Sequence, residues 1–363
     1  MNTNPQRKRI LIAPLDWGLG HATRCLVIIR ALQKFNCDVT VAASGKIKTL
    51  IQNEFPDLHF LDLPGYNISY SKSKRMLPFK ILLQIPKILK IIRLENKWLS
   101  QIIETKKFDA VISDNRFGFH TKQVASVFIT HQLQVKTNFW GTDTLLRRLN
   151  YRYVNRFSEC WIPDFADHLN ISGQLSHPKI LPAIPVKYLG PLSRFRKRNR
   201  DNLAKFKYMA IISGPEPQRS VFEKKIIEVT SKTNDEFLVV RGLPGEKENT
   251  FQLPNCKVFN HLNTNEMEEA LEYSEFIISR CGYTTAMEIL SLQKKSILIP
   301  TPGQTEQEYL AEHLLKQNWC YTFDQEDDFE FHLQKAKSFE YDLPAMNMQL
   351  HEEIISGFIN SLQ

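Results

Sequence analysis

The chain has 363 residues, of which 42% are hydrophobic, and a formal net charge of +8. This length is sufficient for two ordinary domains with separate cores, and the composition excludes extended disorder. The six cysteines are scattered without a CxxC pair, which argues against a disulfide framework and against a zinc site. A polar first segment without a signal-peptide pattern, and the lack of about 20 uninterrupted apolar residues, predict a cytoplasmic protein.

The charge is divided unevenly along the chain. Residues 1–207 carry 34 Lys and Arg against 14 Asp and Glu, a balance of +20. Residues 208–363 carry 13 against 25, a balance of −12. This asymmetry indicates two domains with different tasks, the basic one facing an anionic partner or a membrane surface. A solvated basic face without a partner is the alternative.

Strands alternate with helical patterns along the whole chain. The apolar runs of the first half that predict buried parallel strands are "RILIAPL", "DVTVAAS", "FDAVISD" and "SVFITHQ". Those of the second half are "YMAIISG", "EFLVVRG", "KVFNHL", "EFIISR" and "KSILIP". A stretch rich in proline and basic residues, near 181–200, is expected to be a linker.

Two αβ series joined by a linker predict two doubly wound, Rossmann-like domains that face each other across a cleft. The expected boundaries are residues 1–190 for the first domain and 191–345 for the second. A last helix, residues 346–363, is expected to pack back on the first domain. Ligands of such sheets bind beyond the carboxyl ends of the strands, so the residues after each strand are the candidates for function.

The loop "DWGLGHATR" follows the first predicted strand and opens the first helix. A dinucleotide fingerprint requires a third glycine where Thr23 stands, and an acidic residue after the second strand, which ends in Ser44 and Gly45. A Walker loop is also disfavoured, because Ile47 follows the Gly-Lys pair. What remains is a turn with Gly18 and Gly20 whose amides face an anion, or a plain structural turn.

The segment "FIISRCGYTTAMEILSLQKKSILIPTPGQTEQEYLAEHL", residues 276–314, resembles the donor-binding half of the MurG-type glycosyltransferases, family 28, which have the GT-B fold. The glycine loop at the start of the chain is similar to that of the same superfamily, in which a Gly-His pair begins the first helix. The likeness is strong over residues 209–315, clear over 10–32 and thin between 50 and 190.

The resemblance implies a nucleotide-sugar site in the second domain. Glu288 would accept hydrogen bonds from the ribose hydroxyls, although Thr285-x-x-Glu288 also fits a capping box. Gln307 would contact the sugar, and Glu308 has a structural alternative in a second capping box with Thr305. The other residues that the resemblance assigns to the donor are Ser213, Gly214, Arg219, His261, Leu262, Ser279, Gly282, Tyr283, Thr284 and Thr285. The chain reads Gln307-Glu308 where the MurG pattern has a glutamine pair.

Catalysis is expected in the first domain. Glycosyl transfer requires a base for the acceptor hydroxyl, and His21 has a suitable pKa range and lies at the glycine loop. Asp114 and His131 follow neighbouring strands and could replace or orient His21. No metal site is expected, because helix N-termini and amides can neutralise the diphosphate. A helix-capping role for His21 is the alternative.

Two basic segments are candidates for the acceptor. Residues 70–107 interleave apolar residues with lysines and arginines, a pattern typical of a peripheral helix on an anionic membrane or of a helix covering the sheet. Residues 144–157 add four arginines with interleaved aromatic residues.

The resemblance implies an inverting, metal-independent glycosyltransferase that moves a sugar from a nucleotide-sugar donor, which we expect to be UDP-linked, to a hydroxyl of a glycolipid or cell-envelope glycan. It would work in the cytoplasm or peripherally at the inner face of the cytoplasmic membrane. A nucleotide-sugar 2-epimerase of the same fold is the enzymatic alternative. A nucleic-acid-binding protein is another, disfavoured because it leaves the donor motif unexplained.

Overall fold

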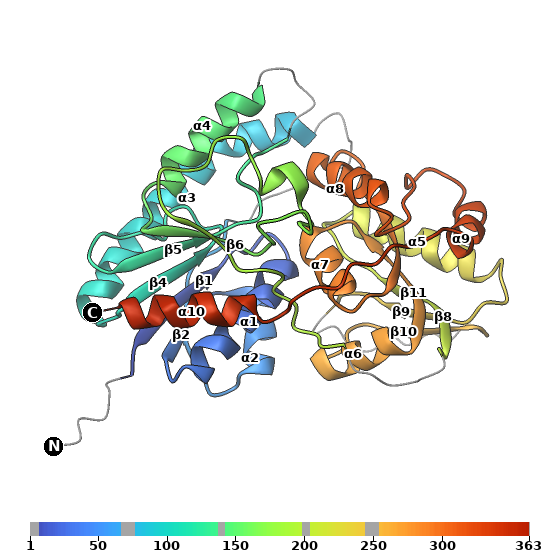
Figure 1. The fold of residues 1–363 in the computed structure, drawn as a ribbon, viewed down its shortest axis with the longest axis horizontal. Coiled ribbons are helices and arrows are strands. Elements are labelled where there is room, and N and C mark those ends of the chain that lie inside the picture. The colour runs from blue at the N-terminus through green and yellow to red at the C-terminus, as the bar shows by residue number, and fades with distance from the viewer. Residues whose placement is uncertain (1–6, 67–76, 137–141, 198–203, 244–253, 363) are drawn as a thin grey trace. The chain divides into compact units, whose positions relative to one another are not determined.

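The computed structural model describes residues 7–66, 77–136, 142–197, 204–243 and 254–362, with the backbone alone for residues 77–82. The chain forms two compact units, each built on a parallel sheet with helices packed against it (Figure 1). Unit 1 comprises residues 1–69, 79–192 and 347–363, and unit 2 comprises residues 70–78 and 193–346. The predicted fold class, two doubly wound α/β sheets, is confirmed.

Within the described residues, the sheet of unit 1 has seven parallel strands in the order β3-β2-β1-β4-β5-β6-β7. The strands are β1 Arg9–Pro14, β2 Asp38–Ala42, β3 His59–Leu61, β4 Ala110–Asp114, β5 Ala125–Ile129, β6 Glu159–Ile162 and β7 Val186–Tyr188. The strand order reverses between β1 and β4, which are neighbours, and β5 lies on the other side of β4. Pro14 is paired with Asp114, and Asp114 with Ile129, so the carboxyl ends of these strands meet at one point of the edge.

The helices of unit 1 are amphipathic and cover this sheet. They are α1 Leu19–Lys34, α2 Gly45–Glu54, α3 Leu77–Thr105, α4 Thr142–Val154 and α10 Leu350–Ser361. The C-terminal helix α10 lies alongside α1 (Figure 1), and an ion pair of 2.5 Å joins Lys34 Nζ to Glu352 Oε2. The Phe358 ring also meets the Trp161 ring edge-on at 5.2 Å between centroids.

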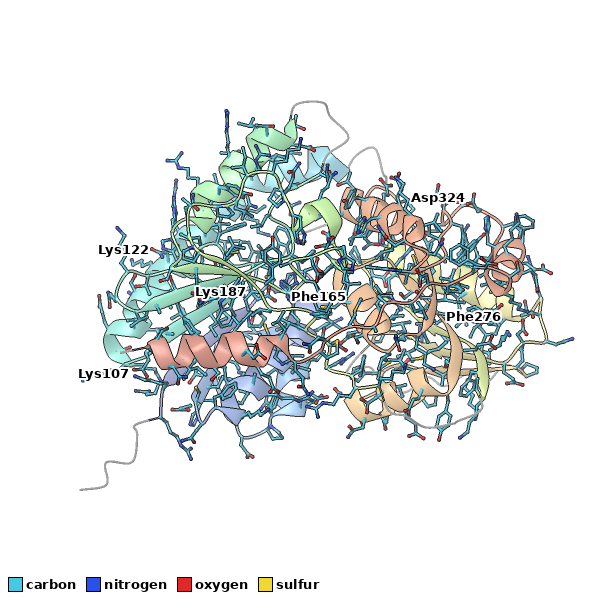
Figure 2. The ribbon with its side chains drawn as sticks, viewed as in Figure 1. Lys107, Lys122, Phe165, Lys187, Phe276 and Asp324 are labelled. Atoms are coloured by element: carbon cyan, nitrogen blue, oxygen red, sulfur yellow. The ribbon has the colours of Figure 1, made fainter. Side chains whose placement is uncertain are left out.

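Unit 2 has five parallel strands among the described residues, in the order β10-β9-β8-β11-β12. They are β8 Phe206–Ile211, β9 Phe237–Val240, β10 Cys256–Phe259, β11 Ser274–Arg280 and β12 Lys295–Ile299. The core is apolar and aromatic: Phe276, labelled in Figure 2, is buried, and its ring centroid lies 5.7 Å from that of Tyr208. The helices are α5 Gln218–Thr230, α6 Thr264–Glu272, α7 Tyr283–Ser291, α8 Thr305–Lys316 and α9 Phe329–Lys337.

The observed strands include all nine apolar runs singled out in the sequence and three more, β3, β6 and β7. β3 and β7 have three residues each, are only half-buried or exposed, and lie at the two edges of their sheet. Such edge strands have no long apolar run, because fewer of their faces are covered. The expected linker near 181–200 is therefore partly wrong, since Val186–Tyr188 is a strand of the first sheet.

Candidate active site

The glycine loop of unit 1 connects β1 to α1 in a conformation that requires glycine. Gly18 is the N-cap residue of α1 and has a φ of 145°, which residues with a side chain rarely adopt. Gly20 lies in the first turn, and its carbonyl accepts a hydrogen bond of 3.0 Å from Thr23 Oγ1. The third helical residue is His21, which places its side chain at the carboxyl edge of the sheet.

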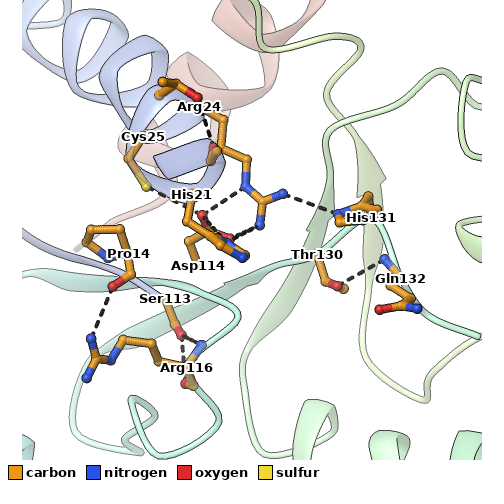
Figure 3. Close-up of polar contacts among 12 residues, drawn as sticks. Pro14, His21, Arg24, Cys25, Ser113, Asp114, Arg116, Thr130, His131 and Gln132 are labelled. Carbon is orange, nitrogen blue, oxygen red and sulfur yellow. Dashed lines mark hydrogen bonds and ion pairs between the residues drawn. The ribbon is translucent and has the colours of Figure 1, made fainter. Parts of the chain in front are cut away.

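The structure brings together the three predicted catalytic side chains (Figure 3). His21 Nδ1 lies 3.1 Å from Asp114 Oδ2 at the end of β4. His131 follows the end of β5, next to β4 in the sheet. The Asp114 side chain is fully buried, whereas 17% of the His21 side chain is exposed. His21 can therefore meet a ligand directly, and Asp114 can act only through His21.

A fourth residue, Arg24, joins this cluster and was not expected from the sequence. Its guanidinium binds Asp114 through two nitrogens, with Nε donating to Oδ2 at 2.8 Å and Nη2 to Oδ1. Nη2 also lies 2.8 Å from His21 Nδ1, and Nη1 lies 3.2 Å from His131 Nδ1. The spacing His21-x-x-Arg24 could have revealed it, because residues three apart on a helix share a face.

Burial and charge together set the protonation states. Burial lowers the pKa of His21; the Asp114 carboxylate opposes this effect and the Arg24 guanidinium adds to it. Burial alone would raise the pKa of Asp114, but Arg24 and His21 bring it down to about 2. At neutral pH the cluster therefore holds an ionised carboxylate beside a neutral imidazole, the arrangement that a general base requires.

The neighbouring thiol has no such activation. Cys25 Sγ lies 3.7 Å from Asp114 Oδ2, and burial followed by this negative charge raises the pKa of the thiol. Cys25 stays protonated, so the cluster has no thiolate nucleophile.

A second buried ion pair lies beneath the glycine loop. Arg116 Nε donates to Glu95 Oε1 at 2.6 Å, and Tyr66 Oη donates to Glu95 Oε2 at the same distance. Arg116 also binds the carbonyl of Pro14, just before the loop, at 3.1 Å. The Tyr66 amide donates to Asp16 Oδ1 at 3.0 Å. This network connects α3 to Pro14 at the end of β1 and to Asp16 at the beginning of the glycine loop.

In unit 2, the predicted ribose ligand Glu288 lies in the second turn of α7 and is buried. Its Oε1 accepts a hydrogen bond of 2.9 Å from Arg194 Nε. Burial raises the pKa of Glu288 and Arg194 lowers it, the burial effect being the larger. The capping box with Thr285 does not form, because α7 starts at Tyr283 and its N-cap is Gly282.

Of the remaining predicted residues around α7, Ser279, Tyr283 and Thr284 are buried, whereas Gly282 and Thr285 are partly exposed. Tyr283 and Thr284 open the helix, and Gly282 has no side chain that could occupy its first amides. Ser279 is fully buried in β11, where its hydroxyl donates to the Arg280 carbonyl. The Arg280 guanidinium ties this strand to its surroundings by donating to the carbonyls of Pro300 and Gln218, at 3.2 and 3.1 Å.

The segment that follows β8 contains a carboxylate, Glu216, that pairs with the predicted phosphate ligand Arg219. Ser213 and Gly214 lie in the loop, Gly214 with a φ of 104°. Glu216 Oε1 accepts from Arg219 Nε at 2.8 Å, and Glu216 Oε2 accepts from the Ser220 amide at 3.3 Å. Arg219 also pairs with Glu223 at 2.9 Å. The positive charge expected from Arg219 is thus already shared between two carboxylates.

The other predicted donor residues lie at loops of the same sheet edge. His261 and Leu262 connect β10 to α6, which begins with a capping box between Asn263 and Glu266. Gln307 Oε1 accepts from the Thr301 amide at 2.9 Å, and Glu308 Oε1 from the Gly303 amide at 3.0 Å. Both side chains therefore fix the loop before α8, although the N-cap of that helix is Gln304.

Two helices carry most of the two basic segments: α3 covers residues 77–105 of the first and α4 covers residues 144–154 of the second, while residues 70–76 lie outside the described residues. α3 continues through Pro86 as one helix. Ile88 and Ile92 of α3 belong to the same apolar cluster as Tyr153 of α4. Leu83 on α3 and Leu145 on α4 are exposed, at 81% and 58%. In the part of the chain that the structure describes, no helix is long and apolar enough to cross a membrane. No group of three metal-ligating side chains occurs there either.

Comparisons with known proteins give a consistent result. Residues 213–341 match the model of the glycosyltransferase family 28 C-terminal domain. Over 318 residues, covering 86% of this chain and 83% of the relative, the sequence is 24% identical to the "UDP-N-acetylglucosamine--N-acetylmuramyl-(pentapeptide) pyrophosphoryl-undecaprenol N-acetylglucosamine transferase" of Buchnera aphidicola subsp. Schizaphis graminum.

Solved structures share the fold over nearly the whole length. The crystal structure of the glycotransferase of kitacinnamycin matches with a TM-score of 0.63 and 15% identity, over 99% of this chain and 95% of that one. MurG of Acinetobacter baumannii matches with a TM-score of 0.54 and 14% identity, over 98% and 96%.

Proposed function

We propose that this glycosyltransferase, whose residues 213–341 match the model of the glycosyltransferase family 28 C-terminal domain, is an inverting, metal-independent enzyme. Its donor would be a nucleotide sugar, most simply a UDP-sugar. The acceptor would be a hydroxyl of a glycolipid or cell-envelope glycan. The single observation that carries this proposal is the buried Asp114 carboxylate on Nδ1 of a neutral, partly exposed His21.

The chemistry follows from this pair. The acceptor hydroxyl loses its proton to His21 Nε2 while its oxygen attacks the anomeric carbon of the donor sugar. The new carbon–oxygen bond forms on the face opposite the bond to the nucleoside diphosphate, which leaves with its electron pair, so the configuration inverts. Asp114 stabilises the imidazolium that forms, because its charge lies against the Nδ1 hydrogen. The assignment of the ring hydrogen to Nδ1 follows from this role.

The donor would be held by unit 2. The α7 N-terminus offers backbone amides and the positive end of a helix dipole to a diphosphate, with Gly282 leaving room for it. Glu288, with one oxygen held by Arg194, would accept from ribose hydroxyls. This arrangement supports a diphosphate site made of amides and dipoles, which is the reason for proposing that no metal takes part.

The acceptor proposal rests on α3 and α4. Exposed leucines on these helices alternate with exposed or half-exposed cations, among them Lys87, Lys90 and Arg148. A surface of this composition suits an anionic membrane that presents a lipid-linked acceptor. The name of the Buchnera relative also contains a lipid pyrophosphate, the pyrophosphoryl-undecaprenol group.

Calorimetric titration without metal tests the donor. The purified protein is titrated with UDP, GDP, TDP and UDP-sugars, beside Glu288→Ala and Glu312→Ala. The second variant is the matched control, because Glu312 lies exposed on α8 in an ion pair with Lys316. We expect binding of one nucleotide, weakened about 10- to 100-fold by Glu288→Ala and unchanged by the control.

Binding of no nucleotide would overturn the proposal. Binding that requires Mg²⁺ would overturn its metal-independent part. Isomerised sugar in the absence of any acceptor would replace the transferase by a 2-epimerase.

A further inference from the structure

Arg24 is the one side chain of the described cluster that contacts all three predicted catalytic residues (Figure 3). It projects from α1, Asp114 ends β4 and His131 follows β5, so three segments of unit 1 meet at one guanidinium. Its side chain is 2% exposed. An arginine buried to this degree is costly unless its hydrogen-bonding groups find partners, and here the partners are the predicted active-site groups themselves.

Two groups compete for Nδ1 of His21. Asp114 Oδ2 can accept a hydrogen from this nitrogen at 3.1 Å, and Arg24 Nη2 can donate to it at 2.8 Å. A hydrogen on Nδ1 satisfies Asp114 and leaves Nε2 free to act as a base, but a second proton on the ring places a cation next to the Arg24 guanidinium. Arg24 therefore opposes protonation of the ring, whereas Asp114 favours it.

We propose that Arg24 is a positioning residue that holds Asp114 and His131 in place around His21 and keeps the His21 ring neutral until the acceptor transfers its proton. This inference rests on the proposed function for its catalytic meaning. The groups that act on the His21 ring are Asp114 from β4, Arg24 from α1 and His131 from the segment after β5, while the Cys25 thiol of α1 lies against Asp114. Among them Arg24 is the fixed positive charge.

The guanidinium fork is necessary for this task. Nε and Nη2 point side by side at the two Asp114 oxygens, while Nη1 remains directed to His131. A lysine would supply the charge from a single nitrogen and could not span both partners. Substitutions of Arg24 can therefore separate the effect of its charge from the effect of its forked geometry.

The test is a histidine titration by NMR on the full-length, histidine-labelled protein, with the His21 signal assigned from His21→Gln. Arg24→Gln removes the charge but keeps a donor for the buried carboxylate, and Arg24→Lys keeps the charge but removes the fork. Arg30→Gln is the matched control, because Arg30 lies on the same helix in a half-exposed pair with Glu54. This readout requires neither donor nor acceptor.

We expect the titration midpoint of His21 to move to higher pH in Arg24→Gln and to stay near the wild-type value in Arg24→Lys and Arg30→Gln. A midpoint that does not move in Arg24→Gln overturns the inference, whatever the enzyme's reaction.

Kinetics with the donor that binds in the calorimetric test give the second readout. For Arg24→Gln the acid limb of the kcat/KM profile should follow the NMR midpoint to higher pH. For Arg24→Lys, kcat should fall about a hundredfold with KM for the donor unchanged, because the ring is misplaced while unit 2 is intact. If Arg24→Gln does not fold, an unaltered kcat in Arg24→Lys still overturns the positioning role. If the wild-type enzyme has no transferase activity but the His21 midpoint still moves in Arg24→Gln, the proposed function is contradicted and the role of Arg24 is not.

Discussion

Arginine is used in different ways at the carboxyl edges of the two sheets. In unit 1, Arg24 and Asp114 surround a titratable ring, so their charges set the protonation state of His21. In unit 2, Arg219 pairs with Glu216 and Glu223, and Arg194 pairs with Glu288. Charges that converge on an imidazole prepare a site for proton transfer. In unit 2 the arginine charges are balanced by carboxylates. The groups that remain for a ligand are backbone amides and the buried Glu288, and these suit binding of a nucleotide.

This comparison predicts that chemistry and nucleotide binding can be lost independently. The largest effect is expected from Asp114→Asn, which removes the negative charge beside Nδ1, lets an amide NH2 compete for this position, and leaves the imidazolium without its counter-charge. We expect kcat to fall about 10³- to 10⁴-fold while the calorimetric affinity for the nucleotide is unchanged. Asp62→Asn is the control, because Asp62 is exposed in a pair with Lys48 in the same unit. If Asp114→Asn lowered the nucleotide affinity as much as kcat, catalysis and nucleotide binding would not be independent.

The second prediction concerns the ion pair beneath the glycine loop. Glu95→Ala leaves the Arg116 guanidinium buried without its carboxylate, and we expect the free energy of unfolding to fall by about 3–5 kcal/mol. Urea denaturation followed by tryptophan fluorescence measures this loss. Glu104→Ala, an exposed position on the same helix, should change it by less than about 0.5 kcal/mol. A similar small change in both variants would show that the network does not stabilise unit 1.

The smallest effect is expected from Arg194→Met in unit 2. Burial already raises the pKa of Glu288, and Arg194 is the partner that lowers it, so its loss raises that pKa further. A carboxylate binds hydroxyl groups above its pKa and loses this ability as the pH falls through it. Nucleotide binding should therefore decline at a higher pH in the variant than in the wild type, while binding at high pH weakens by less than about tenfold.

Titration calorimetry over a series of pH values measures this shift. Lys197→Met, an exposed position close by in the chain, is the control. An identical pH dependence of nucleotide binding in Arg194→Met and in the wild type would remove Glu288 from the binding site.

The periodicity of apolar residues predicted most of the fold correctly. Runs such as "RILIAPL" and "EFIISR" became central strands, because a strand buried on both faces must be apolar along its length. The same argument explains what was missed. Val186–Tyr188 lies at the edge of its sheet and is half-buried, so nothing in its composition separates it from the linker expected there.

Local motifs were less reliable than strand positions. Thr285-x-x-Glu288 fits a capping box in the sequence, yet the N-cap of α7 is Gly282, three residues before Thr285, and Glu288 pairs with Arg194 instead. The start of α7 is fixed by Gly282 and by the buried strand before it. A pattern of four residues does not contain this information.

The sequence by itself determined the two parallel sheets, the glycine loop and the position of His21, Asp114 and His131 after their strands. These features follow from local periodicity and from the rule that ligands bind at the carboxyl ends of strands. Only the tertiary structure decided that Asp114 lies on His21 Nδ1 and that the Arg24 guanidinium reaches both Asp114 and His131. Contacts between side chains 90 residues apart depend on strand order and on burial, which no local pattern records.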